Sequence, residues 1–275
     1  MTILIIGGSG FLGTELVRQA AVAGHATAAT FATRPGNTPE VSWHALDLHD
    51  FDRIQAVMAK VEPHVVVNAT SGGPDWTVTA EGPVRLAMTA AKHGSRLVHV
   101  SSDAVFSGVR VHYDESCLPD PLTPYGAAKA AAETGVRIVH PGAVVARTSL
   151  IIGDRRSEHV RAVHDLAAGT RTGVLFTDDI RCPVHVADLA AALLELASSD
   201  RSGVHHLAGT DAVSRHELGT LIARRDGLDA SQLPAGLRAD SALPGARDVR
   251  LDSRASQDRL RTRLRGARQF LALGA

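Results

Sequence analysis

The sequence has little cysteine and lacks the spacings that would make its histidines metal ligands. Cys117 and Cys182 stand in unrelated contexts without a Cys-x-x-Cys pair, so no disulfide scaffold, zinc site or redox pair is predicted. Among the fourteen histidines, His205 and His206 are adjacent, and no His-Glu-x-x-His motif occurs. We therefore predict two reduced thiols, no bound metal and a cytoplasmic location.

The chain also lacks an excess of one charge and a long hydrophobic run. Its 29 Lys and Arg residues balance 29 Asp and Glu residues, so neither nucleic acid nor a membrane is a predicted partner. The arginine-rich stretch from Arg259 to Arg268 is interpreted as a solvated amphipathic helix. The apolar run before Gly7 is too short for a signal peptide or a membrane span. A small neutral or anionic molecule is the expected partner.

Buried strands alternate with helices over the first half of the sequence. With 275 residues and 44% hydrophobic residues, the chain is long enough to bury a core without metals or disulfides. The expected strands are residues 2–6, 25–30, 42–46, 64–68, 96–101 and 142–151. The expected helices are residues 11–23, 50–61, 83–93 and 124–139. This alternation predicts an α/β fold with a doubly wound parallel (Rossmann) sheet.

The alternation ends after Gly153, which divides the chain into two expected parts. Residues 1–153 are predicted to form a dinucleotide-binding Rossmann domain. Residues 154–275 are predicted to form mainly a small C-terminal substrate lobe, with elements around 183–200 packing back onto the first part. The stretch 201–275 is too poor in apolar runs for a second sheet of its own. We expect the substrate to bind in a crevice between the two parts.

A glycine-rich turn follows the first expected strand, in the run Gly7-Gly8-Ser9-Gly10-Phe11-Leu12-Gly13. Glycine there permits a tight turn and close approach of backbone N–H groups to a pyrophosphate, so a dinucleotide cofactor is predicted. The acid that usually contacts the NAD ribose is missing, and Arg34 follows the second expected strand instead. We predict that NADP(H) is preferred and that NAD(H) can also be used. The alternative is that Arg34 is an ordinary solvated residue.

A tyrosine and a lysine stand four residues apart in one expected helix, as Tyr125 and Lys129. This spacing places both side chains on one helix face, where a cation favours the phenolate and lowers the pKa of the phenol. Ser102 ends the strand that precedes this helix, at the carboxyl edge where open α/β sheets bind ligands. The three residues predict a site for proton transfer to a carbonyl oxygen.

These residues resemble the extended short-chain dehydrogenase/reductase superfamily, and within it the dTDP-4-dehydrorhamnose reductase-like, sugar-nucleotide-binding group. The matching blocks are residues 7–13, 47–48, 68–70, 98–108, 113–115, 121–129, 147–149 and 182–190. The Ser-Asp-x-Val-Phe-x-Gly segment within residues 98–108 indicates the reductase group.

The resemblance implies a role for each matching residue. Tyr125 would donate the proton, Lys129 would lower the pKa of Tyr125 and hold the nicotinamide ribose, and Ser102 would bind the substrate carbonyl. The implied cofactor contacts are Gly7, Ser9, Gly10, Phe11, Leu12, Gly13, Arg34, Asp47, Leu48, Asn68, Ala69, Thr70, Tyr125 and Lys129. The implied substrate contacts are Ser71, Trp76, Asp103, Ala104, Leu150 and Arg181.

Two of these substrate residues have a structural alternative. Arg181 either meets a substrate phosphate or carboxylate, or forms an ion pair with Asp178 or Asp179. Trp76 either walls the substrate pocket or fills the core.

The sequence departs from the reductase group at three positions. Ala104 and Leu150 stand where the group usually has aromatic residues, and Thr79 replaces an asparagine. A roomier pocket without aromatic stacking surfaces predicts weak activity with dTDP-4-dehydrorhamnose and better activity with a different, bulkier ketone.

The function expected from the residues and the resemblance is NADP-dependent reduction of a carbonyl group on a sugar nucleotide or a related small molecule. Two alternatives remain open: a nucleotide-sugar epimerase, and a non-catalytic NADP-binding regulatory subunit like the β subunit of methionine adenosyltransferase. A homodimer is also left open.

Overall fold

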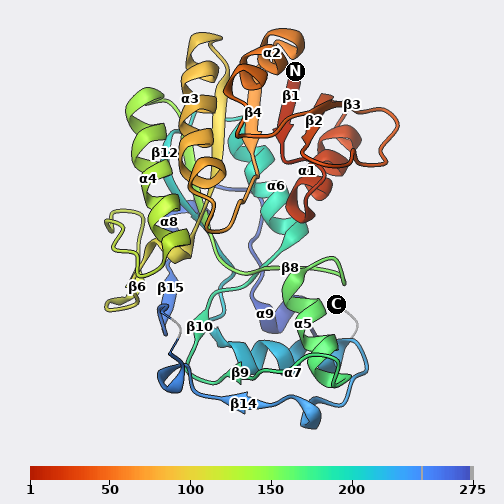
Figure 1. The fold of residues 1–275 in the computed structure, drawn as a ribbon, viewed down its shortest axis with the longest axis vertical. Helices are drawn as coiled ribbons and strands as arrows, with labels where there is room; N and C mark the ends of the chain where they lie inside the picture. The colour runs from red at the N-terminus through yellow and green to blue at the C-terminus, as the bar shows by residue number, and fades with distance from the viewer. Residues whose placement is uncertain (243, 273–275) are drawn as a thin grey trace.

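The computed structural model describes residues 1–242 and 244–272, and Figure 1 shows it as two parts, one above the other. The upper part contains a parallel seven-stranded sheet with the order β12-β7-β5-β4-β1-β2-β3. Its strands are β1 (Thr2–Ile6), β2 (Ala26–Phe31), β3 (Ser42–Ala45), β4 (Val65–Asn68), β5 (Arg96–Ser102), β7 (Val144–Thr148) and β12 (Gly203–Leu207). This order confirms the predicted doubly wound α/β fold.

Helices cover both faces of the sheet because its strands bury both faces. Ile3 and Ile5 of β1 pack on the side of two helices, whereas Leu4 and Ile6 pack on the side of three others. The first two are α1 (Phe11–Val22) and α6 (Val186–Ala197); the other three are α2 (Phe51–Val61), α3 (Gly82–Lys92) and α4 (Pro124–Val139). The alternation along β1 follows from the two-residue period of a strand.

Helix α4 has a well-defined N-terminus, which fixes the position of Tyr125. The side chain of Thr123 accepts a hydrogen bond from the backbone N–H of Gly126, and Pro124 occupies the first helical position. Both features are favourable at a helix N-terminus. Tyr125 therefore lies in the first turn of α4, beside the end of β5.

The expected strand over residues 142–151 is two strands with different partners. β7 stays in the main sheet, whereas β8 (Ile151–Ile152) pairs with β11 (Val184–His185). The hydroxyl of Thr148 donates to the carbonyl of Leu207, and the carbonyl of Leu150 accepts from Val184 N. These bonds redirect the chain out of the sheet, which the continuous apolar run does not reveal.

The lower part is a smaller lobe built around its own apolar core, which includes Val160, Leu218, Ile222 and Phe270. Its elements are α5 (Glu158–Ala167), β9 (Leu175–Phe176), β10 (Ile180–Arg181), β13 (Val213–Ser214), α7 (Arg215–Arg225), η3 (Ala230–Gln232), β14 (Ala235–Gly236), η4 (Arg238–Asp240) and α9 (Ala267–Phe270). The remaining elements are η1 (Thr77–Glu81), η2 (Asp103–Val105), β6 (Val111–Tyr113), β15 (Val249–Leu251) and α8 (Arg254–Gln257).

The arginine-rich stretch is not the predicted helix, and this expectation was wrong. Only residues at its end belong to α9; Arg261 N and Thr262 N donate to Glu195, and Arg265 bonds to Asp188. These two acids lie on α6, so α6 fixes the stretch along its surface. Helix α5 and strand β12 were not predicted, because polar residues interrupt the apolar pattern in both segments.

Neither a membrane-spanning helix nor a metal-binding cluster occurs in the part of the chain that the structure describes. No helix there is both long and apolar enough to cross a membrane. No group of three or more His, Cys, Asp or Glu side chains there could hold a metal ion.

Candidate active site

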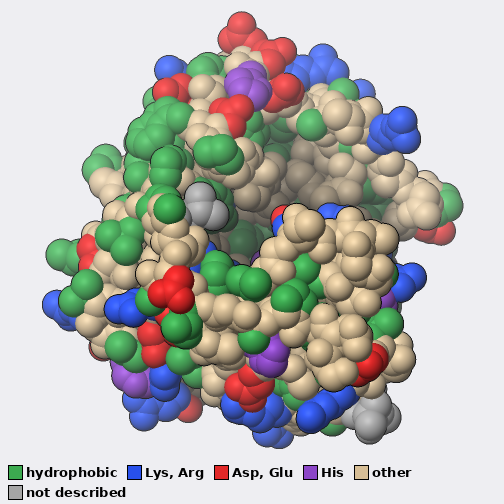
Figure 2. Space-filling model, turned by 60° about the horizontal axis from the view of Figure 1, so that its bottom comes forward, with side chains coloured by type: hydrophobic (Ala, Val, Ile, Leu, Met, Phe, Trp, Pro, Cys, Tyr) green, Lys and Arg blue, Asp and Glu red, His purple; other side chains and the backbone are tan. Residues whose placement is uncertain are grey.

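A cavity of about 720 Å³ lies between the carboxyl end of the sheet and the lobe, and Figure 2 shows the hollow from the lobe side. It extends from the start of α1 to η4. Residues from both parts line it: Gly10, Phe11, Leu12, Ala69, Thr70, Ser71, Ser102, Asp103, Ala104, Tyr125, Lys129, Leu150, His159, Asp179, Arg181, Arg215 and Arg238. The predicted catalytic residues therefore share one cavity. We call Ser71, Ser102, Tyr125 and Lys129 the cavity floor.

The Tyr125 phenol lies between two hydroxyl groups of the cavity floor. Ser71 and Ser102 both hydrogen-bond its side chain. Burial raises the pKa of Tyr125 above its ordinary value, although the two hydrogen bonds oppose this shift. The phenol consequently keeps its proton at neutral pH, as a proton donor must.

Lys129 lies one helical turn beyond Tyr125 and is buried. Its Nζ donates to the carbonyl oxygens of Val100 at 3.1 Å and Thr70 at 3.3 Å. Burial lowers the pKa of Lys129 to about 8, and Glu133 opposes this shift. The ammonium group is therefore close to neutralisation at physiological pH, and a nearby ligand can change its protonation.

A buried ion pair holds the three elements that surround the floor. The Glu133 carboxylate on α4 accepts from Arg147 Nε and Nη2 on β7, at 2.8–3.1 Å. Ser101 on β5 donates its hydroxyl to the same carboxylate at 2.5 Å. The Arg147 and Glu133 side chains are 1% and 2% exposed, so their charges are compensated within the protein. α4, β5 and β7 are thus joined directly beneath the floor.

Ser102 is oriented by its own strand end. Its Oγ accepts from Ala104 N at 3.1 Å and lies 3.3 Å from Asp103 Oδ1. The other oxygen of Asp103 accepts the hydroxyl of Ser149 at 2.6 Å. Asp103 is thereby bonded within the wall of the cavity, and Ala104 and Leu150 supply no aromatic ring at their two positions in the lining.

The glycine turn can take a pyrophosphate without steric conflict. Gly7 has a φ of +79°, and a Cβ on Gly13 would lie 2.0 Å from the carbonyl oxygen of Gly7. No side chain caps the start of α1 at Gly10, and its first turn carries no acid. The N-terminal N–H groups of α1 therefore face the cavity end, which Gly10, Phe11 and Leu12 line. Ser9 lies exposed on the same turn.

The end of β4 is fixed by Asn68, which is buried. Its Oδ1 accepts from Thr70 N and Thr70 Oγ1, at 3.1 and 2.7 Å. Burial lowers the pKa of His99 well below its ordinary value, so the ring is neutral and its Nδ1 can accept from Asn68 Nδ2 at 3.2 Å. These bonds direct Ala69 and Thr70 to the cavity, whereas the Asn68 side chain itself stays in the core.

Asp47, Leu48 and Arg34 are among the predicted cofactor residues that do not line the main cavity. Asp47 is exposed, lines a separate shallow pocket, and accepts from His49 Nδ1 at 2.7 Å. The side chain of Leu48 is buried against Gly82. Arg34 is exposed in the loop after β2, and β2 lies beside β1 and its glycine turn. The structure thus keeps Asp47 and Arg34 accessible to a bound molecule.

Two predicted substrate residues are not available as expected. Arg181 donates to the carbonyls of Ile180, Ala246 and Arg247 and pairs with Asp179 at 2.8 Å, which is the structural alternative. The hydrogen bonds of its guanidinium are therefore made within the protein. Trp76 is 48% exposed and neither lines the cavity nor fills the core.

Sequence reasoning missed the part of the cavity that the lobe supplies. We call this set the lobe wall: His159, Asp179, Arg215 and Arg238. Its members come from four separate elements or turns, so no spacing in the sequence links them. Only Asp179 was noted, as a partner of Arg181. The other missed pair, Glu133 with Arg147, shows one signal, since Glu133 follows Lys129 by four residues on the same helix face.

Comparison with known proteins places this geometry in a family. The family model described as "RmlD substrate binding domain" matches residues 1–272. The chain belongs to this family. It is 30% identical to a dTDP-4-dehydrorhamnose reductase of Mycobacterium tuberculosis over 257 residues, covering 89% of this chain and 82% of that protein. It is 29% identical to a probable low-salt glycan biosynthesis reductase of Haloferax volcanii, covering 91% of this chain and 88% of that protein.

A solved structure has the same fold as this chain over almost the whole length of both proteins. The dTDP-4-dehydrorhamnose reductase of Bacillus anthracis, in complex with NADP, superposes with a TM-score of 0.83 and 21% identity. The match covers 98% of this chain and 96% of that one. The sequence-based assignments to the reductase-like group, and to oxidoreductases of the short-chain dehydrogenase/reductase type, are therefore confirmed.

Proposed function

We propose that this RmlD family member reduces a carbonyl group on a sugar nucleotide or a related small molecule, with NADPH as the preferred reductant. The observation that carries the proposal is the cavity floor, where Ser71, Ser102 and Tyr125 hydroxyls converge beside buried Lys129. The floor lies in the same cavity as the glycine turn. A hydride source and a proton source would thus meet at one end of the cavity.

The residues at the glycine turn fit a dinucleotide. Gly7 has a positive φ and Gly13 packs directly against the Gly7 carbonyl, so the tight turn requires both glycines, and the uncapped start of α1 favours a pyrophosphate. Arg34 would hold the 2′-phosphate, and Asp47 would contact the adenosine end. When bound, the nicotinamide supplies the hydride that this chain cannot supply itself.

The floor residues would divide the remaining work. Ser102 and Ser71 would orient the carbonyl oxygen through their hydroxyls, replacing part of their bonding to Tyr125. Tyr125 would give its phenolic proton to that oxygen, because burial keeps this group protonated before the reaction. Lys129 would stabilise the phenolate that remains and hold the cofactor ribose, since its Nζ lies on the same helix face.

The test is an assay of purified protein with NADPH and a panel of 4-keto sugar nucleotides that includes dTDP-4-dehydrorhamnose. Net NADPH oxidation is the expected result, with a bulkier ketone preferred over dTDP-4-dehydrorhamnose because Ala104 and Leu150 supply no aromatic surface at their two positions in the pocket. Isomerisation without net oxidation would instead identify an epimerase. NADPH binding without turnover of any member would contradict the proposal and favour a regulatory subunit.

A further inference from the structure

The loop over residues 153–157, through which the chain enters the lobe, runs beside the glycine turn. A Cβ on Gly153 would lie 2.9 Å from the ring of Phe11, so this loop begins in direct contact with the first residue of α1. Arg156 follows in the same loop and lines the cavity together with Gly10 and Phe11. The lobe therefore brings an arginine to the end of the cavity that carries the glycine turn.

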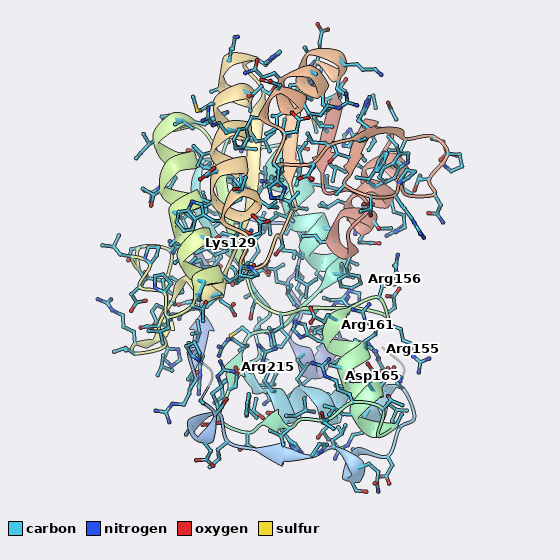
Figure 3. All side chains as sticks on the ribbon, in the orientation of Figure 1. Lys129, Arg155, Arg156, Arg161, Asp165 and Arg215 are labelled. Carbon is cyan, nitrogen blue, oxygen red and sulfur yellow. The ribbon has the colours of Figure 1, made fainter. Side chains whose placement is uncertain are left out.

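Arg156 lies close to α1 although it belongs to the loop before α5. Figure 3 shows its side chain between the start of α1 and α5, whereas Arg155 lies on the outer side of α5. The hydrogen bond to Asp154 raises the pKa of Arg156 above its ordinary value, and the charge of Glu15 on α1 adds to this rise. The guanidinium is therefore within electrostatic range of α1.

The ion pair that Arg156 forms with Asp154 is a weak one. Arg156 donates to both carboxylate oxygens of Asp154 at 2.9–3.2 Å, but the two side chains are 59% and 58% exposed. Water screens such a pair, so Arg156 can exchange this carboxylate for another anion at little cost in free energy. Asp154 would keep a compensating charge, because Arg225 also lowers the pKa of Asp154.

The glycine turn needs a cation that its own residues do not supply. The partial charge at a helix N-terminus is about half an elementary charge, which is less than the charge of a pyrophosphate. Among the described residues that line the cavity, Lys129 belongs to the floor and three other arginines surround Asp179. This leaves Arg156 as the lining cation beside the turn.

The nearby acid of the lining does not cancel this charge. Glu158 lines the cavity next to Arg156, but it is the first residue of α5, where the N-terminus of that helix favours a carboxylate. A guanidinium is also the side chain best suited to a pyrophosphate, because its planar fork binds phosphate oxygens through paired N–H donors.

We infer that Arg156 binds the pyrophosphate of the cofactor from the lobe side, opposite the N–H groups of α1. The inference rests on the proposed function, because it requires a dinucleotide at the glycine turn, and it adds a cofactor contact from the second part of the molecule. A bound cofactor would then also hold the start of α5, which carries His159 of the lobe wall. Cofactor binding would thus position one side of the substrate cavity.

The experiment is calorimetric titration of the full-length chain with NADPH and with NADH. Arg156→Gln should weaken the binding of both cofactors about tenfold, because both carry the same pyrophosphate and the lost hydrogen bonds are to a charged group. The ratio of the two affinities should stay at the parent value, which separates this contact from the 2′-phosphate contact proposed for Arg34. Arg156→Lys should retain part of the affinity, because it keeps the charge but loses the fork.

The matched control is Arg155→Gln, which removes the same charge from the neighbouring position. Arg155 donates to His164 Nδ1 at 2.6 Å and does not line the cavity, so this variant should bind both cofactors as the parent does. Thermal unfolding without cofactor shows whether each variant is folded.

Asp154→Asn distinguishes direct binding from a merely structural role of the ion pair. If Arg156 contacts the cofactor, removing the charge of its partner frees the guanidinium, and both cofactors should bind at least as tightly as they bind the parent. If the pair acts only by holding the loop in place, Asp154→Asn should lose as much affinity as Arg156→Gln, and this result would overturn the inference.

Two further results would also contradict it: Arg156→Gln binds both cofactors within about twofold of the parent, or it loses affinity for NADPH alone. Failure of the proposed function has a different signature. In that case the parent binds neither cofactor, or it binds NADPH with the expected dependence on Arg156 but reduces none of the ketones.

Discussion

The floor and the lobe wall of one cavity differ in how closely their charged groups are paired. On the floor, the buried charge is satisfied: Lys129 donates to two carbonyls, and Glu133 beneath it is paired with Arg147. On the lobe wall, Arg215 and Arg238 share a distant carboxylate at 3.5 and 3.9 Å. The difference indicates that the charges of the floor are paired closely within the protein, whereas those of Arg215 and Arg238 are paired only at longer distances.

The largest expected effect is on the floor. Tyr125→Phe removes the proton donor but keeps the ring, so kcat should fall by about 10² to 10⁴. Affinity for NADPH should remain, because cofactor binding does not depend on the phenol proton. Steady-state kinetics and calorimetry measure both quantities. If the kcat of Tyr125→Phe is within about threefold of the parent value, Tyr125 is not the proton donor.

The second prediction concerns the electrostatic cost of the floor. Burial lowers the pKa of Lys129 from its ordinary value of 10.5 to about 8, so between these pH values the unfolded chain binds a proton that the folded chain does not. Stability therefore rises with pH across this window, and below pH 8 the cost is present in full. In the parent, this contribution raises the free energy of unfolding by about 3 kcal/mol between pH 8 and pH 10.5. The Lys129→Met variant should lack this rise.

Urea denaturation from pH 7 to 10.5 measures the free energy of unfolding of both proteins. The hydrogen bonds lost in Lys129→Met lower this free energy equally at every pH, so they do not change its slope. Lys92→Met, at an exposed lysine, is the matched control and should follow the parent. If the Lys129→Met and parent curves run parallel, the lysine is not buried as a near-neutral group.

The smallest expected effect lies at the cofactor end, where Arg34 is exposed and its contribution is reduced by solvent. NADPH should bind about tenfold more tightly than NADH, and Arg34→Ala should remove most of this preference. Calorimetry with both cofactors measures it, with Arg53→Ala as a surface control on α2. An unchanged preference in Arg34→Ala would show that other groups recognise the 2′-phosphate.

The same contrast explains what could be predicted from the sequence. The floor was predicted because Tyr125 and Lys129 belong to one helix, and Ser102 ends an apolar strand whose carboxyl edge is the usual binding edge. The bounds of α4 were predicted to the residue, and a proline marks its start. Helical and strand periodicity carries this information locally.

The lobe wall could not be predicted because its geometry depends on tertiary contacts. Arg215 of α7 and Arg238 of η4 meet Asp179 only in the folded chain, and an arginine-rich sequence offers many equivalent candidates. Arg181 illustrates the same difficulty, since its neighbours Asp178 and Asp179 suggested an ion pair but could not decide between this pair and a ligand. The stretch around Arg261 and Arg265 does not form the predicted helix, because Glu195 and Asp188 of α6 bind it instead.

The buried pair of Glu133 and Arg147 also decides where the molecule opens. Separating such a pair leaves an uncompensated charge and costs about 3–5 kcal/mol, so α4, β5 and β7 should open together as one slow cooperative unit. The long contacts of Arg215 and Arg238 impose no comparable barrier on the lobe. Amide protons of β5 should therefore exchange with solvent only through global unfolding, and those near η4 through local fluctuations. A substrate can then enter through movements of the lobe while the position of Tyr125 is unchanged.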